Sequence, residues 1–226
     1  IESIYTNPNK SRIQINKHLL DMLPNLKVIC TASTGTVHID KNECSVRNID
    51  IISIAKEIPV LEKISSTAEM SFLLMMAGIR NFVPSIEDVR NGNWDCDKFV
   101  GRQINNLNVG IIGYGRLGKM FYKYCEAFNS KIHVYDPYVK IDNLNKVESL
   151  KELVEVSDVI AIHVHVTDET KEMINEEVLS YCKCNMIMVN TSRGEIIEEH
   201  SMINFLKKNP NSKYYTDVVS SENLDK

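Results

Sequence analysis

Three glycines in this sequence have the spacing of a phosphate-binding loop. Gly113, Gly115 and Gly118 stand in GxGxxG order within VGIIGYGRLGKM, after an apolar segment and before a helical one. In such a loop, the first glycine allows a tight turn and the second lets the backbone approach a pyrophosphate. The third lets the helix pack closely on the strand. The phosphate charge then meets the free N–H groups at the helix N-terminus. The loop therefore predicts a dinucleotide site.

An acidic residue follows the loop at the distance expected for NAD. The segment KIHVYD ends in Asp136, eighteen residues after Gly118. A carboxylate about 20 residues beyond the loop hydrogen-bonds the ribose hydroxyls of NAD and disfavours the extra phosphate of NADP. Pro137 follows directly, so an ordinary turn at the strand end is the alternative. We expect NAD as the cofactor.

An arginine stands where a buried strand is expected to end. In MIMVNTSRGEII, apolar residues lead into a polar run that contains Arg193, and two isoleucines follow. An arginine on a surface loop needs no explanation, whereas one at the end of a buried strand does. Arg193 is therefore either a solvated loop residue or a group directed at a ligand.

These residues need a scaffold that brings them together. From Leu107 onward, apolar strands alternate with helical segments, which predicts an α/β fold with a parallel sheet covered by helices on both faces. The strands read as continuous apolar runs, as expected when both sheet faces are buried. The expected strands are NVGIIGYG, KIHVYD, DVIAIHV, NMIMVNT and KYYTDVV, and the expected helices are 116–128, VESLKELVEVS, ETKEMINEEVLSYC and EEHSMINFLKKN.

The part before Leu107 is expected to contain two strands and one long helix. LKVICTA and IDIISIA are the predicted strands, and STAEMSFLLMMAGIRN is the predicted helix, with Ser66 or Thr67 as its cap and a methionine-rich core face. The segment NGNWDCDKFVGRQINN, which carries the only tryptophan, is interpreted as a crossover between two structural units.

Composition limits the class of protein. The 226 residues are 43% hydrophobic, with a formal charge of −4, which suits one or two globular domains and no nucleic-acid partner. No apolar run approaches the ~18–20 residues of a membrane span, and no segment resembles a signal peptide. Six scattered cysteines lack the usual zinc spacing, so we expect reduced thiols, a cytoplasmic protein and no metal site.

Several linked motifs together resemble the D-isomer-specific 2-hydroxyacid dehydrogenase family, most closely its phosphoglycerate-dehydrogenase-like branch. The resemblance spans residues 23–222 and implies an NAD-dependent oxidoreductase that interconverts a D-2-hydroxy acid and its 2-keto acid, and a homodimer. The alternative is a non-catalytic NAD-sensing binding protein of the same fold, similar to the C-terminal-binding-protein corepressors. The motifs are ASTGTVHID, SSTAEM, GIIGYGRLGKM, VYDPY, SDVIAIHVHVTDETK, NTSRGEI and TDVVSSE.

The resemblance implies a catalytic set of arginine, glutamate and histidine. NTSRG matches the arginine motif at Arg193, and DVVSSE places the glutamate at Glu222. Arg193 would bind the carboxylate and carbonyl of a 2-keto acid with its planar fork. Glu222 would orient a histidine that serves as general acid or base. The family places this histidine after the glutamate, so we expect it beyond Lys226. His163 and His165 are not expected to be the catalytic acid.

The resemblance also implies binding residues and a domain division. Ser33, Thr34 and Gly35 would hold the substrate carboxylate together with Arg193, and an ordinary strand-to-helix turn is the alternative for this loop. Residues 1–65 would be a partial, flavodoxin-like substrate domain. Residues 66–226 would be a Rossmann-type NAD-binding domain without its last strand, and the helix at 66–81 and the Trp94 segment are candidate dimer contacts. The implied cofactor-binding residues are Gly113, Tyr114, Gly115, Arg116, Leu117, Gly118, Asp136, Val164, Thr191, Ser192 and Asp217.

Overall fold

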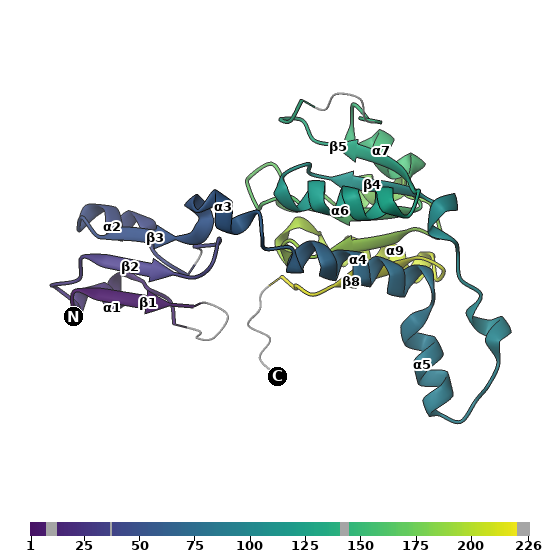
Figure 1. Cartoon of the computed structure of the whole chain (residues 1–226), viewed down its shortest axis with the longest axis horizontal. Coiled ribbons are helices and arrows are strands. Elements are labelled where there is room, and N and C mark those ends of the chain that lie inside the picture. The colour runs from purple at the N-terminus through teal and green to yellow at the C-terminus, as the bar shows by residue number, and fades with distance from the viewer. Residues whose placement is uncertain (8–12, 37, 141–144, 221–226) are drawn as a thin grey trace. The chain divides into compact units, whose positions relative to one another are not determined.

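The computed structural model describes residues 1–7, 13–36, 38–140 and 145–220. The chain divides into two compact units, Ile1–Ile64 and Ser65–Lys226 (Figure 1). Each unit contains its own parallel sheet, with strand order β1-β2-β3 in the first and β5-β4-β6-β7-β8 in the second. Parallel strands require crossover connections, and helices provide most of them here. The chain therefore has the predicted α/β class.

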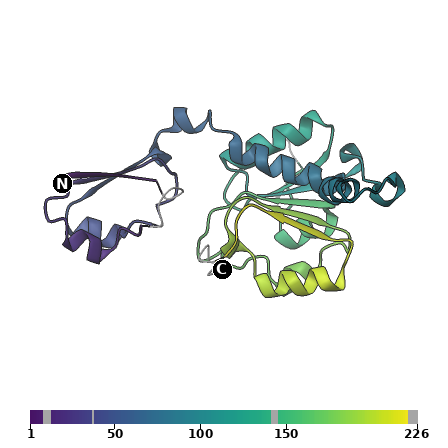
Figure 2. The same ribbon diagram turned by 90° about the horizontal axis from the view of Figure 1, so that it is seen from below.

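The first unit contains a small sheet with two helices on one side, followed by η1 (Ile54–Lys56) and α3 (Ile58–Leu61). Its strands are β1 (Ser3–Thr6), β2 (Val28–Thr31) and β3 (Asp50–Ser53), and the connecting helices are α1 (Lys17–Asp21) and α2 (Lys41–Val46). Figure 2 shows both helices on the same side of the sheet. Apolar residues from strands and helices meet there in a compact core. That core consists of Ile15, Leu20, Leu26, Ile29, Ile39, Cys44 and Ile49.

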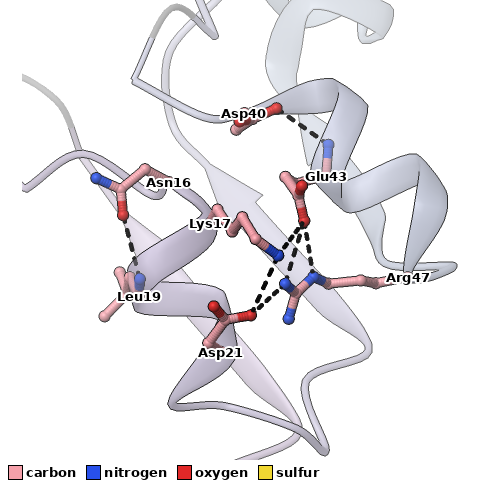
Figure 3. Close-up of polar contacts among 7 residues, drawn as sticks. All are labelled: Asn16, Lys17, Leu19, Asp21, Asp40, Glu43 and Arg47. Atoms are coloured by element: carbon pink, nitrogen blue, oxygen red, sulfur yellow. Dashed lines mark hydrogen bonds and ion pairs between the residues drawn. The ribbon is translucent and has the colours of Figure 1, made fainter.

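Polar side chains fix the two helices of this unit. Asn16 caps α1 and Asp40 caps α2, each accepting a hydrogen bond from a backbone N–H in the first turn (Figure 3). Arg47 donates to Asp21 on α1 and to Glu43 on α2. The Arg47 guanidinium lowers the pKa of the Asp21 carboxyl. The two helices are thus joined by charge as well as by the core.

The second unit contains five parallel strands with a reversal of strand order. The sheet starts with β4 (Asn108–Ile112), continues to β5 (Lys131–Tyr135) on one side, and then crosses to β6 (Val159–Ile162) on the other. β7 (Ile187–Asn190) and β8 (Lys213–Thr216) extend the sheet in that direction. In open sheets of this kind, ligands bind beyond the carboxyl ends of the strands at the point of reversal.

Helices cover both faces of this sheet. On one face, α4 (Ser66–Ile79) and α6 (Arg116–Ala127) share a core with the strands. On the other face, the core includes α7 (Leu150–Val156), α8 (Glu176–Ser180) and α9 (Glu199–Lys208). All four residues of β6 and of β7 are buried, and all of them except Asn190 are apolar. The predicted doubly wound, Rossmann-type sheet is confirmed.

Some local predictions were wrong. The helix expected over 169–182 is confined to α8, because Ile174 forms an isolated bridge to Ile197 instead of continuing a helix. Ser65, not Ser66 or Thr67, is the N-cap of α4, and its hydroxyl donates to Glu69 in the first turn.

The part of the chain between β3 and β4 differs in two respects from what the sequence predicted. A helix that the sequence did not suggest, α5 (Phe82–Arg90), precedes residues 91–106. The interpretation of those residues as a crossover between two units was wrong, because they lie within the second unit, which begins at Ser65. That segment itself contains the short 3-10 helices η2 (Cys96–Phe99) and η3 (Ile104–Asn106).

On α4, Met75 is buried but Met70 is exposed, so the methionine-rich face belongs only partly to the core. Among the described residues, no helix has both the length and the apolar character needed to span a bilayer.

Candidate active site

The predicted site residues of the second unit gather at one edge of its sheet. The glycine loop follows β4, Asp136 follows β5, Val164 follows β6, Arg193 follows β7 and Asp217 follows β8. Since the five strands are parallel, their carboxyl ends lie at the same edge. Ser33, Thr34 and Gly35 follow β2 in the other unit. Glu222 lies outside the described residues.

Two of the three loop glycines are required by the protein itself. Gly113 has φ of +91°, and a Cβ at this position would lie 2.6 Å from the carbonyl oxygen of His163. A Cβ on Gly118 would lie 2.1 Å from the carbonyl oxygen of Gly113. A Cβ on Gly115, in contrast, would meet no described atom within 4 Å. The space beside Gly115 is therefore open, as close approach by a pyrophosphate requires.

The start of α6 suits an anion for a second reason. Gly115 is the N-cap of α6 and has no side chain that could cap the first-turn N–H groups. The helix dipole places partial positive charge at this end. Phe121 and Cys125 are fully buried and anchor the helix on the sheet. The residues present thus fit the diphosphate of a dinucleotide.

Asp136 is held rigidly beside this loop. Its Oδ2 accepts a hydrogen bond from the Tyr114 N–H at 2.8 Å. Its Oδ1 accepts from the N–H groups of Tyr138 at 2.9 Å and Val139 at 3.1 Å. Carboxylate oxygens have two lone pairs each, so Oδ2 keeps acceptor capacity for a further donor such as a ribose hydroxyl. Asp136 therefore joins the strand end to the glycine loop and also presents an acceptor there.

The His163 side chain packs beside the glycine loop and is not suited to act as a general acid. Its ring lies 5.0 Å from that of Phe121, measured between centroids. The residue keeps some exposed surface, but both ring nitrogens are buried and have no hydrogen-bond partner among the described residues. Burial lowers the pKa of His163 to about 4. The imidazole is therefore neutral near pH 7, which agrees with the expectation that it is not the catalytic acid.

The turn that carries Arg193 is fixed by a buried asparagine. Asn190 is 0% exposed, and its Nδ2 donates to the Arg193 carbonyl oxygen at 2.8 Å. Its Oδ1 accepts from the Ser192 N–H at 3.0 Å, and the Ser192 hydroxyl donates to the Ile162 carbonyl oxygen at 2.8 Å. The Arg193 side chain itself is exposed and donates to the Ser192 carbonyl oxygen. A rigid turn thus presents a solvent-accessible guanidinium at the sheet edge.

The turn after β7 lies directly against the segment after β8. The Thr216 hydroxyl hydrogen-bonds the carbonyl oxygen of Asn190 at 2.8 Å. A Cβ on Gly194 would lie 2.0 Å from the Ser220 nitrogen, so the two backbones touch. Partial burial raises the pKa of Asp217, and the positive charge of Arg193 opposes this shift. Arg193 and Asp217 therefore influence each other electrostatically.

Two residues of this arrangement had no predicted role. Asn190 and Gly194 both stand in the quoted NTSRG segment. The available signal was a polar asparagine at the end of an otherwise apolar strand, followed by a glycine next to the arginine. Asn190 fixes the Arg193 turn, and Gly194 lies against the backbone of Ser220, after β8. The second contact depends on a strand that is distant in sequence. The geometry at the sheet edge was therefore needed to identify them.

The substrate-loop candidates of the first unit form a closed turn. The Ser33 hydroxyl donates to the Gly35 carbonyl oxygen at 2.5 Å and lies 3.1 Å from the Thr31 hydroxyl. The Thr31 hydroxyl also lies 3.5 Å from Nε2 of His38, whose pKa is lowered by burial. Thr34 is exposed. Side-chain contacts thus shape the loop, and the predicted binding role of its backbone stays a prediction.

Comparison with known proteins identifies the family. Residues 72–226 match the family model described as the NAD binding domain of the D-isomer specific 2-hydroxyacid dehydrogenases. The chain belongs to this family. The glycine loop, Asp136 and the Arg193 turn all lie inside the matched residues.

Relatives of this dehydrogenase-family chain are considerably longer. It is 28% identical to a D-3-phosphoglycerate dehydrogenase of Methanocaldococcus jannaschii, over 94% of this chain and 41% of the relative. It is 32% identical to a glycerate dehydrogenase of Methylorubrum extorquens, over 94% of this chain and 67% of the relative. A crystal structure of D-lactate dehydrogenase from Aquifex aeolicus with NAD and lactic acid has 31% identity and a TM-score of 0.83, covering 97% of this chain and 65% of that one.

Proposed function

We propose that this protein is an NAD-dependent oxidoreductase that interconverts a D-2-hydroxy acid and its 2-keto acid by hydride transfer, in the manner of the phosphoglycerate dehydrogenases. The observation that supports the proposal most strongly is that the glycine loop, Asp136 and Arg193 lie at the same edge of the sheet. The open space beside Gly115, the held carboxylate of Asp136 and the exposed guanidinium of Arg193 all follow the carboxyl ends of parallel strands. The family membership of the chain supports the same activity.

Each of these residues has a defined part in the proposed site. The first turn of α6, including the backbone N–H groups of Arg116 and Leu117, would hold the diphosphate, with Gly115 allowing its approach. Asp136 would accept from ribose hydroxyls. Val164, Thr191 and Ser192 would line the ribose and nicotinamide side, and Asp217 would accept a hydrogen bond from the carboxamide. When bound, NAD supplies the hydride acceptor, and NADH the hydride donor.

Arg193 would bind and orient the substrate. The carboxylate and carbonyl of a 2-keto acid lie side by side, and a planar guanidinium can bond to both. Its charge would also polarise the carbonyl. Ser33, Thr34 and Gly35 would hold the carboxylate from the substrate unit. Glu222 would orient a histidine, expected beyond Lys226, that gives a proton to the carbonyl oxygen during reduction.

A turnover measurement on the complete protein tests the proposal. We expect NADH to be oxidised when glyoxylate, hydroxypyruvate, pyruvate or 3-phosphohydroxypyruvate is added, and the product to have the D configuration. If the protein binds NADH tightly but reduces no 2-keto acid in such a panel, it is instead a non-catalytic NAD-sensing protein of the same fold.

The proposal extends to assembly, domains and compartment. We infer a homodimer formed through the nucleotide unit, because exposed apolar residues gather on α4, α5 and the segment that follows, among them Leu73, Phe82 and Trp94. Residues 1–65 would be the substrate domain and 66–226 the NAD-binding domain. Since all six cysteines are free thiols, a reducing compartment such as the cytoplasm would suit the protein.

A further inference from the structure

Glu199 connects the start of α9 to the segment after β8, which carries Asp217, although it lies outside the family motifs. It stands in the first turn of α9, where a carboxylate also interacts favourably with the helix dipole. Its Oε1 accepts a hydrogen bond from the Ser220 N–H at 3.2 Å and another from the Ser220 hydroxyl. Within the part of the chain that the structure describes, Glu199 provides the side-chain hydrogen bonds to Ser220.

The segment that Glu199 holds is the one that carries Asp217. Residues 217–220 follow β8, and their start is fixed by Thr216, whose hydroxyl accepts from the Val218 N–H at 3.1 Å. Their end lies against Gly194, where a Cβ would clash with the Ser220 nitrogen at 2.0 Å. Glu199 therefore holds the end of this segment at Ser220 by its two hydrogen bonds. Without it, the described part of the segment would keep its hydrogen bond to Thr216 and its backbone contact with Gly194, but would lose the hydrogen bonds at Ser220.

The Glu199 carboxylate also lies within electrostatic reach of the β8 side chains. Burial is the main cause of the raised pKa of Tyr214, and the negative charges of Glu199 and Asp217 add to it. Tyr214 in turn lies 3.3 Å from the Nδ2 of Asn190, the residue that fixes the Arg193 turn. Glu199, the Asp217 segment and the arginine turn are thus linked by hydrogen bonds and backbone contact, with a weaker electrostatic link through Tyr214.

We propose that Glu199 is a positioning residue that holds residues 217–220 against the Arg193–Gly194 turn and so fixes Asp217 toward the nicotinamide half of the cofactor. The inference rests on the proposed function for the role of Asp217. Because the residues around the glycine loop are separate from this clasp, loss of Glu199 would affect the nicotinamide half of NADH and leave the ADP-ribose half unchanged.

Binding of two ligands to the complete protein tests this inference. The affinities of NADH and of ADP-ribose, which lacks nicotinamide, are measured by titration calorimetry for the wild type and for Glu199→Ala. We expect NADH to bind about three- to tenfold more weakly to the variant, the range that loss of one or two exposed hydrogen bonds gives, and ADP-ribose to change by less than about twofold. Equal changes for both ligands, or no change for either, would overturn the inference.

Two further variants separate positioning from a general effect on folding. Glu199→Gln keeps an amide oxygen that can accept both hydrogen bonds, so we expect NADH affinity within about twofold of the wild type. Glu176→Ala, which removes a first-turn glutamate from α8, should leave both affinities unchanged. If Glu199→Gln resembles Glu199→Ala, the hydrogen bonds are not the cause and the inference fails.

The outcome is distinguishable from failure of the enzyme proposal. A wild-type protein that binds NADH but reduces no 2-keto acid refutes the oxidoreductase, while the ratio of NADH to ADP-ribose affinities still decides the role of Glu199. A wild-type protein that binds neither ligand overturns both.

Discussion

At the scale of single residues, the surroundings of Arg193, Asp136 and His163 determine what each side chain can do in the candidate site. Arg193 is exposed on a turn whose backbone Asn190 fixes by two hydrogen bonds, so its side chain starts from a defined position at the sheet edge. Asp136 is held by three backbone donors. His163 is packed with buried nitrogens and is unsuited to proton transfer near pH 7.

Arg193 should not tolerate a change to lysine. An ammonium group is a point charge and cannot make two parallel hydrogen bonds to a carboxylate and a carbonyl. We expect Arg193→Lys to lower kcat/KM for 2-keto acids by about 10²-fold while NADH affinity stays close to the wild-type value. Steady-state kinetics and NADH titration measure both quantities, and Arg90→Lys on α5 is the control. Near-normal turnover by Arg193→Lys would contradict the assigned role.

His163 should make the protein sensitive to acid. In the unfolded chain the imidazole takes up a proton near its ordinary pKa of 6.5, whereas in the folded protein it does so only at about pH 4. The unfolded state therefore binds more protons between these values, and the free energy of unfolding falls as pH drops from 6.5 to 4. The loss attributable to His163 is on the order of 3 kcal/mol.

Denaturant unfolding at several pH values measures this effect. The variant His163→Phe should lose less stability than the wild type between pH 6.5 and pH 4, because it has no group to protonate there. His200→Phe, at an exposed position, should follow the wild type. Parallel acid profiles for the wild type and His163→Phe would show that this imidazole is not the source.

At the scale of elements, the turn between β4 and α6 contains two glycines that the packing of the protein requires and one, Gly115, that it does not. Gly113 and Gly118 are surrounded so closely that a Cβ would overlap backbone atoms. Gly115 has open space at the same point, and it also begins α6. The packing therefore accounts for Gly113 and Gly118, and the proposed cofactor accounts for Gly115.

Two alanine variants separate these roles. Gly115→Ala should change the free energy of unfolding by no more than about 1 kcal/mol but weaken NADH binding at least about tenfold, because the methyl group fills the space for the pyrophosphate. Gly118→Ala should cost about 2 kcal/mol or more in stability, since its methyl group would press on the Gly113 carbonyl. Thermal unfolding and NADH titration report the two effects. A stable Gly118→Ala, or tight NADH binding by Gly115→Ala, would contradict this division.

The sequence predicted the sheet and the glycine loop well, because both depend on local patterns. Continuous apolar runs identify β6 and β7 without any knowledge of their neighbours. The sequence-based prediction failed where contacts between distant residues determine the local structure. Ile174 pairs with Ile197, so the helix expected from residue 169 begins only at Glu176. The hydrogen bonds from Ser220 to Glu199 join residues 21 positions apart, and the helical pattern that contains Glu199 does not indicate its partner. Helix α5 was missed because Pro84 and polar residues mask its short apolar face.

At the scale of the whole molecule, the two units have separate cores and separate proposed tasks. All predicted cofactor residues lie in the second unit, and the Ser33–Gly35 loop lies in the first. The second unit also carries exposed apolar residues on and after α5, including Trp94, which is 88% exposed. In the proposed dimer these side chains would lie in the interface between subunits.

Replacement of Trp94 should weaken the proposed dimer. We expect Trp94→Glu to shift the protein from dimer to monomer in light scattering coupled to size-exclusion chromatography, because a charge in an apolar interface is costly to bury. Val46→Glu, at an exposed apolar position of the first unit, is the matched control and should not change the mass. A wild-type protein that is monomeric at all concentrations would contradict the dimer.

We propose that the sheet edge beyond β4 to β8 binds NAD and that Arg193 orients a 2-keto acid beside it. A crystal structure of the complete protein with NADH and oxamate, an unreactive analogue of a 2-keto acid, tests this claim most directly. We predict the diphosphate at the first turn of α6, a ribose on Asp136, and the Arg193 guanidinium about 3 Å from the oxamate carboxylate. Cofactor bound away from the glycine loop, or oxamate held without Arg193, would contradict it.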